Sequence, residues 1–290
     1  MFLLSFLFLQ VYAEICYAVA TGGRKDGHYT NTTQIVDFLR NSHAVKKAGD
    51  LPQACAGHSI VAAEGFDGRL AFVLGGRSVG QTKDKIFGLD SSYEWTTVGT
   101  LVEAREGHVS INYGEYIYTC GGQQNSKIIS SCEKSAASIV SGDKWLIFGG
   151  QLKMGYTRSV ESISLSDLET TSSFSFEDPL PVLLTESAAL LGQDGQVFIT
   201  GGFNHSRYSD FGREEIIEYG DQNVGALPGG RRMHSVASWS EKSLIVGDYD
   251  ARPESKALLF ENGEITEYRL TGYSPNALMA TTTVCFPIPI

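Results

Sequence analysis

Residues 99–122 read Gly-Thr-Leu-Val-Glu-Ala-Arg-Glu-Gly-His-Val-Ser-Ile-Asn-Tyr-Gly-Glu-Tyr-Ile-Tyr-Thr-Cys-Gly-Gly. Residues 109–112 predict one strand, Gly114-Glu115 a turn, and residues 116–120 a returning strand rich in aromatic and β-branched side chains. The double glycine at the end permits close backbone approach and backbone angles that other residues rarely adopt. The stretch is therefore a β-hairpin that carries two markers, a histidine and a double glycine, which can be followed along the chain.

The double glycine recurs after short apolar runs. It stands at positions 22–23, 75–76, 121–122, 149–150 and 201–202, and Gly247-Asp248 is a sixth copy without its second glycine. The successive steps are 53, 46, 28, 52 and 46 residues, with a mean of 45. A fixed period of this size predicts an array of one supersecondary unit.

A second marker keeps the same register. Residues His58, His108, Ser187 and His234 stand six positions after Pro52, Val102, Pro181 and Pro228, respectively. After the double glycine at 75–76, residues 85–90 predict a third strand, and Trp95 leads a fourth. Four short strands per repeat, without an amphipathic helix, are typical of a propeller blade.

These markers also resemble a known repeat. Two apolar residues and a double glycine, followed by an aromatic residue and by a tryptophan eight positions further on, resemble the kelch repeat, and Gly75, Gly76, Phe87 and Trp95 match it best. The resemblance covers nearly the whole chain after residue 13 and implies an all-β fold, a kelch-type β-propeller, and the six glycine markers predict six blades. Gly22 follows residue 13 so closely that its blade is expected to lack an inner strand, which residues 276–284 can supply. The resemblance implies that the N- and C-terminal strands share this blade. The step of 28 residues predicts one truncated blade.

The first thirteen residues are expected to be a leader. An apolar core of about eight residues precedes Val11-Tyr12-Ala13, which suits cleavage before Glu14 by signal peptidase. The segment is shorter than the ~20 residues that a spanning helix needs. Glycosylation sequons at Asn31 and Asn204 agree with export. We therefore expect a secreted, extracellular propeller of residues 14–290; the alternative is that residues 1–13 form an N-terminal strand.

Composition excludes several classes of protein. Hydrophobic residues make up 42% of the chain, which is too high for a disordered protein. The formal net charge of −10 argues against nucleic acid as a partner, because phosphate binding needs a basic surface. We expect a monomer without a membrane span.

The five cysteines suggest two disulfides in an oxidising compartment. If the termini share a blade, Cys16 and Cys285 lie on its strands, and we predict a disulfide that locks the ring. Cys120 ends one strand and Cys132 lies on the next, which predicts a second bond across the hairpin. Cys55 is left over, and the sequence leaves other pairings open. No CxxC pair is present, so we expect no structural zinc site.

Propeller geometry places the loops that lead into the inner strands at the same end as the loops after the double glycines. The ligand-binding candidates at this end are Arg24, Arg77, Arg105, Gln123, Arg231 and Arg232. The kelch resemblance implies that arginines at such positions bind acidic peptides, and guanidinium groups suit carboxylate or sulfate. These positions predict a positive opening on an acidic body. The alternative is that Arg105, Arg231 and the histidines fix the loops through backbone hydrogen bonds.

No catalytic residues, cofactor or metal are predicted, because no Gly-x-Ser-x-Gly or His-Glu-x-x-His motif is present. The leading hypothesis is a non-catalytic binding or scaffold propeller for an extracellular protein or an anionic glycan. One alternative is a mutarotase-like sugar enzyme, which needs an arginine and an acid–base pair in the central opening. The other is an intracellular kelch adaptor, if the leader is not cleaved.

Overall fold

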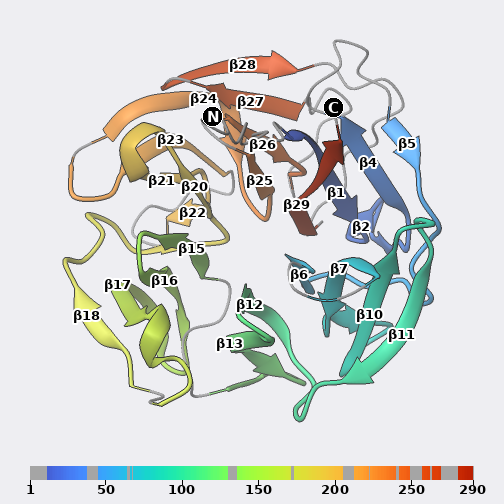
Figure 1. The fold of residues 1–290 in the computed structure, drawn as a ribbon. Helices are drawn as coiled ribbons and strands as arrows, with labels where there is room; N and C mark the ends of the chain where they lie inside the picture. Colours follow the sequence, from blue (N-terminus) through green and yellow to red (C-terminus); the bar gives the residue numbers. More distant parts are fainter. Residues whose placement is uncertain are drawn as a thin grey trace, which may run out of the picture.

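The computed structural model describes residues 12–37, 45–63, 66, 68–129, 136–170, 173–204, 212–221, 223–239, 242–248, 257–261, 263–268 and 280–289. Its sheets are arranged radially around a central axis, which is the architecture of a β-propeller (Figure 1). The predicted all-β propeller is confirmed. The described residues also contain two single turns of 3-10 helix, η1 (Leu165–Asp167) and η2 (Gln193–Gly195).

Five sheets are complete blades of four antiparallel strands, and each is named here after its second strand from the axis. The β1 blade contains β29 (Ala280–Pro289), β1 (Tyr12–Thr21), β4 (Thr33–Asp37) and β5 (Val45–Lys47). The β7 blade contains β6 (Ser59–Ala62), β7 (Arg69–Leu74), β10 (Lys85–Asp90) and β11 (Trp95–Thr100). The β16 blade contains β15 (Ala137–Ser141), β16 (Lys144–Leu152), β17 (Gly155–Ser164) and β18 (Ser175–Glu177). The β21 blade contains β20 (Ala188–Leu191), β21 (Val197–Thr200), β23 (Arg213–Glu218) and β24 (Asn223–Arg231). The β26 blade contains β25 (Ser235–Trp239), β26 (Lys242–Val246), β27 (Ala257–Glu261) and β28 (Glu264–Tyr268).

The blade count differs from the expectation of six blades with one truncated: the described residues form five blades of four strands. The remaining sector holds the β13 sheet, made of β12 (Glu106–Tyr113), β13 (Tyr116–Gln124) and the two-residue strand β14 (Lys127–Ile128). This sheet is the product of the 28-residue step, which is too short to supply two outer strands. Its inner strand β12 contacts β6 on one side and β15 on the other, so the sheet fills its place in the ring.

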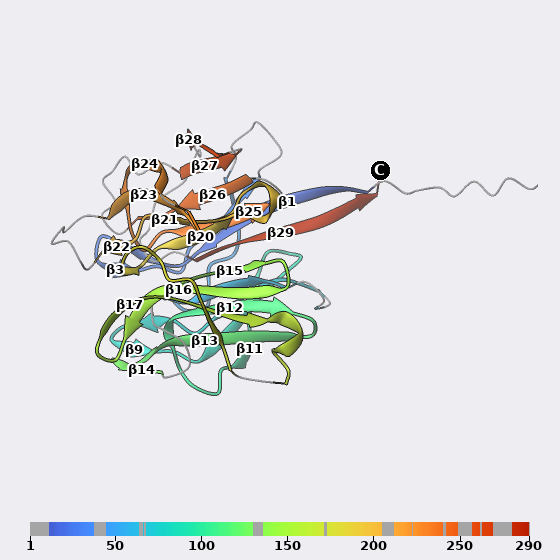
Figure 2. The same cartoon turned by 90° about the vertical axis from the view of Figure 1, so that its left-hand side faces the viewer.

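The two ends of the described chain share one blade. Strand β29 pairs antiparallel with β1 over its whole length and is the inner strand of the β1 blade. The inner strand therefore begins at residue 280 and runs to 289, further along the chain than the expected 276–284. Figure 2 shows the β1–β29 ribbon projecting beyond one face of the ring.

The predicted disulfides fall mostly outside what the structure describes. The β1–β29 register sets Cys16 opposite Cys285, and residues opposite one another in an antiparallel pair lie within the span of a disulfide. Their pairing stays a prediction. Cys120 is disulfide-bonded, but Cys132 lies outside the described residues, so that pairing also stays a prediction. Cys55 is a buried free cysteine.

The leader is also untested, because residues 1–11 lie outside the described residues. Strand β1 begins at Tyr12, so the expected cleavage point before Glu14 falls within this strand. The cleavage, and the domain limit at residue 14, stay predictions.

The apolar cores lie between adjacent sheets. One cluster joins Val19 and Ile35 of the β1 blade to Val73 and Phe87 of the β7 blade. Trp95 belongs to the same cluster, and its indole N–H donates a hydrogen bond to Thr33 Oγ1 at 2.9 Å. The predicted tryptophan marker therefore fixes one blade against its neighbour.

Short hairpins follow the double glycines at one face of the ring. They are β2 (Arg24–Lys25) with β3 (His28–Tyr29), and β8 (Arg77–Ser78) with β9 (Gln81–Thr82). Strand β19 (Leu184–Thr185) pairs with β22 (Phe203–Asn204) at the same face. Figure 2 shows β3, β9, β14 and β22 at the face opposite the projecting end of β1 and β29.

Candidate functional site

The candidate site is the mouth of the central channel, which is built from repeated lead-in loops. The residue just before the inner-strand marker has a left-handed backbone in four sheets: Gly57, Gly107, Glu186 and Met233. The chain then turns inward at His58, His108, Ser187 and His234, which are all buried. We use "mouth" for these four left-handed residues together with Arg77, Glu106, Gln123 and Arg232.

Each histidine holds two neighbouring sheets together. The His108 ring packs against Gly75 of the β7 blade, where a Cβ would lie 3.1 Å from Cε1, and its Nε2 hydrogen-bonds Ser59 Oγ at 2.9 Å. The His234 ring packs in the same way against Gly201, and its Nε2 hydrogen-bonds Thr200 Oγ1 at 2.9 Å. His58 Nδ1 lies 3.5 Å from the thiol of Cys55. The histidines are therefore inter-blade contacts, as the alternative interpretation expects.

Burial keeps these imidazoles neutral. It lowers the pKa of His58 to about 4, and lowers the pKa of His108 and of His234 to about 3. Arg105 adds to the effect at His108, and Arg231 adds to it at His234, because each guanidinium repels a positive imidazolium. Burial also raises the pKa of the Cys55 thiol to about 12, so this cysteine is neutral at physiological pH.

Arg105 and Arg231 occupy equivalent structural positions. Each donates a hydrogen bond to the carbonyl oxygen of the first glycine of its own sheet, Arg105 to Gly121 at 3.1 Å and Arg231 to Gly247 at 3.3 Å. Their own carbonyl oxygens accept from the second glycine of the preceding blade, Gly76 at 2.8 Å and Gly202 at 2.7 Å. Cys55 accepts from Gly23 at the same position of the repeat. The geometry favours a structural role for both arginines over ligand contact.

We expect Arg231→Ala to destabilise the protein by about 2 kcal/mol, because it removes a buried hydrogen bond from a charged donor to the Gly247 carbonyl. Arg231 is only 5% exposed. Thermal unfolding measures the change, and Arg158→Ala is the matched control because Arg158 is an exposed side chain. If Arg231→Ala unfolds at the same temperature as the wild type, the hydrogen bond from Arg231 contributes nothing to folding stability.

The other four candidates, of which Arg77, Gln123 and Arg232 lie at the mouth, all have partners within the protein. Arg77 Nη1 lies 2.7 Å from Glu106 Oε1, and Gln123 Nε2 donates to the same oxygen at 2.8 Å. Arg232 lies 3.6 Å from Glu186 and 5.3 Å above the Phe203 ring. Arg24 donates to the Gly27 carbonyl at 3.0 Å and lies over the Tyr29 ring. Carboxylates thus lie beside two arginines of the expected positive opening, Arg77 and Arg232. The ligand-binding role of the candidates stays a prediction.

Behind the mouth lies a channel of about 260 Å³ lined by small and hydroxyl side chains. Ser59, Ser110, Ser138 and Ser235 line it from four inner strands. Ser59 Oγ hydrogen-bonds Ser110 Oγ at 2.7 Å, and Ser110 continues to Thr119 Oγ1 at 3.0 Å. The channel wall therefore combines a hydrogen-bonded group of hydroxyls around Ser59 with apolar side chains such as Ile60 and Val236.

Sequence reasoning missed Glu106, Glu186, Met233 and the channel serines. Aligning the repeats on the histidine marker would have found two of them, because Glu186 and Met233 stand where Gly57 and Gly107 stand in other repeats. Glu106 carries no such signal, since its role depends on Arg77 from the preceding blade.

The glycosylation sites differ from each other. Asn204 is 8% exposed, which leaves little room for a glycan on that side chain. Asn31 is half-buried, and its Nδ2 donates to the Leu51 carbonyl at 3.2 Å. Modification of either asparagine stays untested.

Two further observations bear on the class of protein. Across the described residues, no helix is long and apolar enough to cross a membrane. Within those same ranges, no three His, Cys, Asp or Glu side chains gather closely enough to hold a metal ion.

The fold and the site define a β-propeller with a mixed-charge mouth over a hydroxyl-lined channel. The chain is similar to the solved structure of YjhT, a kelch-type propeller, with a TM-score of 0.69 and 14% identity over 87% of this chain and 97% of YjhT. That likeness shows the propeller fold alone. No family model matches the chain, and no curated protein matches it, so membership of the kelch family stays a prediction.

Proposed function

We propose that this protein is a secreted, non-catalytic binding propeller that recognises an extracellular protein through its mouth. A propeller is a rigid ring that presents loops from several blades on one face. Loops held by a rigid scaffold are where binding residues concentrate. The propeller fold is consistent with such a binding or scaffold role.

The observation that carries the proposal is the backbone of Glu186 and Met233. Their φ angles are +60° and +54°, a left-handed conformation that costs non-glycine residues about 1 kcal/mol or more. Glycine fills the equivalent positions 57 and 107. Two side chains are thus kept at a strained position beside the channel, and such strain is typical of functional sites.

The charge of the mouth favours a protein over an anionic glycan. Arg77 and Arg232 each face a carboxylate, so a sulfated or carboxylated chain would have to displace Glu106 or Glu186. A protein surface can meet both members of such a pair with complementary groups. Met233 adds a polarizable apolar side chain that adapts to a partner surface.

We expect Glu186→Gly and Met233→Gly to stabilise the fold by about 1 kcal/mol each while weakening partner binding at least about tenfold. Stability rises because glycine relieves the left-handed strain, and binding falls because the contacting side chain is lost. Thermal unfolding gives the first quantity, and calorimetric titration with a partner isolated from the extracellular medium gives the second.

Phe176→Ser is the control for that titration, because Phe176 is an exposed apolar side chain on the outer strand β18. Its affinity should equal that of the wild type. Wild-type affinity in both glycine variants would place binding elsewhere. Binding of heparin that depends on Arg77 would instead favour the anionic-glycan hypothesis.

A second candidate function is sugar anomerisation, and the Glu186–Arg232 pair is the observation that favours it. The two groups lie 3.6 Å apart beside a hydroxyl-lined channel, which is an arginine with an acid–base group nearby. Proton NMR of freshly dissolved sialic acid anomers, with and without the protein, tests it. A rate equal to the background excludes this activity.

Export is part of the proposal and has its own test. The intact mass of the protein secreted from a eukaryotic host, before and after deglycosylation and reduction, reports cleavage before Glu14, sequon use and the number of disulfides. A cleaved chain in which Cys16 and Cys285 are joined supports secretion. A retained, reduced chain favours the intracellular adaptor.

A further inference from the structure

In the part of the chain that the structure describes, one strand edge of the β13 sheet has no partner strand along most of its length. Strand β13 pairs with β12 along its length, but β14 pairs with it only at Gln123 and Gln124. Among the described residues, no strand pairs with the outer side of β13 between Tyr116 and Gly122. In the complete blades, a third strand such as β10 covers this edge of the second strand.

The register identifies which backbone groups face outward. Gly114-Glu115 is a two-residue turn, so Tyr113 and Tyr116 form the hydrogen-bonded pair that closes the hairpin. Hydrogen-bonded and non-bonded pairs then alternate along the ladder. The N–H groups of Ile117, Thr119 and Gly121 therefore point away from β12. The carbonyl groups of Ile117 and Thr119 point the same way. Outward backbone groups at every second residue form a row to which an added strand can hydrogen-bond.

The side chains beside this edge are apolar on both faces. Ile117 packs against the cluster that contains Phe72 and Leu74 of the β7 blade. On the opposite face, Tyr118 packs against the cluster that contains Trp145 of the β16 blade. Residues 117–119 are half-buried, whereas the central residues of β7 and β16 are buried. An extended segment with apolar or β-branched side chains at successive positions would cover both faces, because successive side chains of a strand point to opposite faces.

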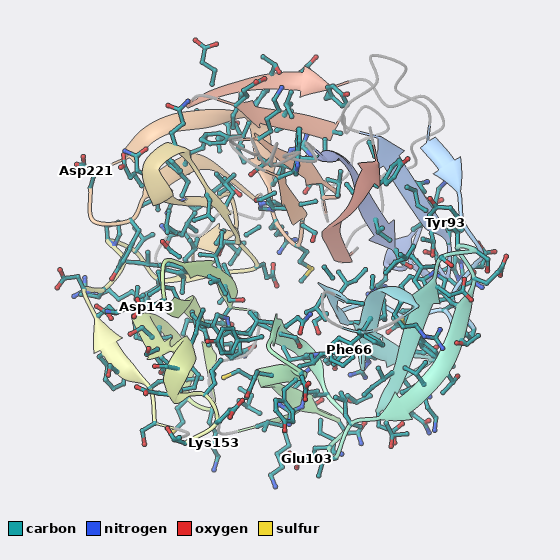
Figure 3. The ribbon with its side chains drawn as sticks, in the orientation of Figure 1. Phe66, Tyr93, Glu103, Asp143, Lys153 and Asp221 are labelled. Atoms are coloured by element: carbon teal, nitrogen blue, oxygen red, sulfur yellow. The ribbon has the colours of Figure 1, made fainter. Side chains whose placement is uncertain are left out.

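Negative charges near the start of β13 indicate which end of an added segment would be basic. Exposed Glu115 lies at the start of β13, and the Glu169 carboxylate acts on the nearby Tyr118 phenol, whose pKa is raised first by burial and then by this charge. Third strands in the complete blades run antiparallel to the second. A segment added in that direction would place its C-terminal end beside Glu115. Figure 3 places Glu103 and Lys153 at the outer rim on the two sides of this sector.

We propose that the open edge of β13 is a docking site for an extended peptide segment of a partner protein, β-branched in its centre and basic at its C-terminal end. The segment completes the truncated sheet as an antiparallel third strand through the outward N–H and C=O groups of Ile117 and Thr119. Backbone hydrogen bonds supply affinity in this mode of recognition, and the side-chain pockets supply specificity.

The test uses the labelled peptide acetyl-Val-Thr-Val-Thr-Val-Lys-Lys-amide and the full chain, with binding followed by fluorescence anisotropy. Two further versions of the peptide carry N-methyl groups on the backbone, one at the odd central positions and the other at the even ones. Each version therefore lacks the N–H donors along one edge of the extended peptide. We expect one version to bind like the parent and the other at least about tenfold more weakly, since two hydrogen bonds are lost. Thr119→Pro should abolish binding, and Thr119→Val, which keeps the backbone donor, should not.

Any of the following three outcomes would overturn the proposal. Equal loss or equal retention in the two methylated peptides would mean that binding does not use one strand edge, and this comparison stands even if Thr119→Pro does not fold. Equal binding of the peptide ending in Glu-Glu would contradict the basic class. A dimer of the protein alone that Thr119→Pro dissociates would show a second copy at this edge. Glu186→Gly should leave peptide binding unchanged, which separates this site from the mouth.

Discussion

Lowering the pH from 6.5 to 5 is expected to remove about 5 kcal/mol of folding stability through three histidines. His58, His108 and His234 have folded pKa values of about 4, 3 and 3, below the ordinary value of 6.5 that they regain on unfolding. Between these values the unfolded chain binds protons that the folded chain does not. Stability is therefore fully present above pH 6.5 and is lost as the pH falls. The change is comparable to the whole stability of many domains.

Urea unfolding at several pH values between 7 and 5 measures this slope. The test variant is His234→Gln, which should reduce the pH dependence by about a third; His28→Gln, which removes an exposed imidazole, is its matched control. A pH-independent unfolding free energy over this range would mean that the three imidazoles are not held neutral by burial.

Gly201→Ala is expected to destabilise the protein by more than about 3 kcal/mol. A Cβ at this position would lie 2.4 Å from the Arg231 carbonyl oxygen and 2.9 Å from His234 Cε1. The backbone oxygen cannot move without breaking its bond to the Gly202 N–H. The substitution thus forces apart the contact between the β21 and β26 blades.

Gly142→Ala is the control that separates crowding from backbone strain. Gly142 has φ +61°, close to the +55° of Gly201, but no atom lies within 4 Å of its added Cβ. Its cost should be about 1 kcal/mol, the strain of the left-handed backbone alone. Equal melting temperatures for the two variants would contradict the close packing of His234 on Gly201.

The propeller fold could be predicted from the sequence because its two markers, the double glycine and the histidine, pack against each other between neighbouring sheets. The double glycine and the histidine keep a fixed register since the His234 ring packs on Gly201 and the His108 ring on Gly75. The shared blade of the two ends was expected from the position of Gly22 and from the kelch resemblance, and β1 does pair with β29. The count of six blades did not hold, because a glycine marker also occurs in the β13 sheet, where the described residues supply no outer strand pair.

The site was predicted less well, for a physical reason. The sequence shows an arginine three residues before a histidine, but not whether its guanidinium points to solvent or inward. Arg105 and Arg231 turn inward to glycine carbonyls of their own sheets. Glu106 neutralises Arg77 across a blade boundary, and a contact between residues 29 positions apart leaves no local pattern.

Hydrogen exchange of the full chain, alone and saturated with its purified extracellular partner, tests the binding-propeller proposal most directly. The mouth proposal predicts slower exchange at the lead-in loops of residues 55–58, 104–108, 184–187 and 230–234, and no change at the projecting ends of β1 and β29. Protection confined to the projecting face or to the outer strands, with the lead-in loops unchanged, would contradict it.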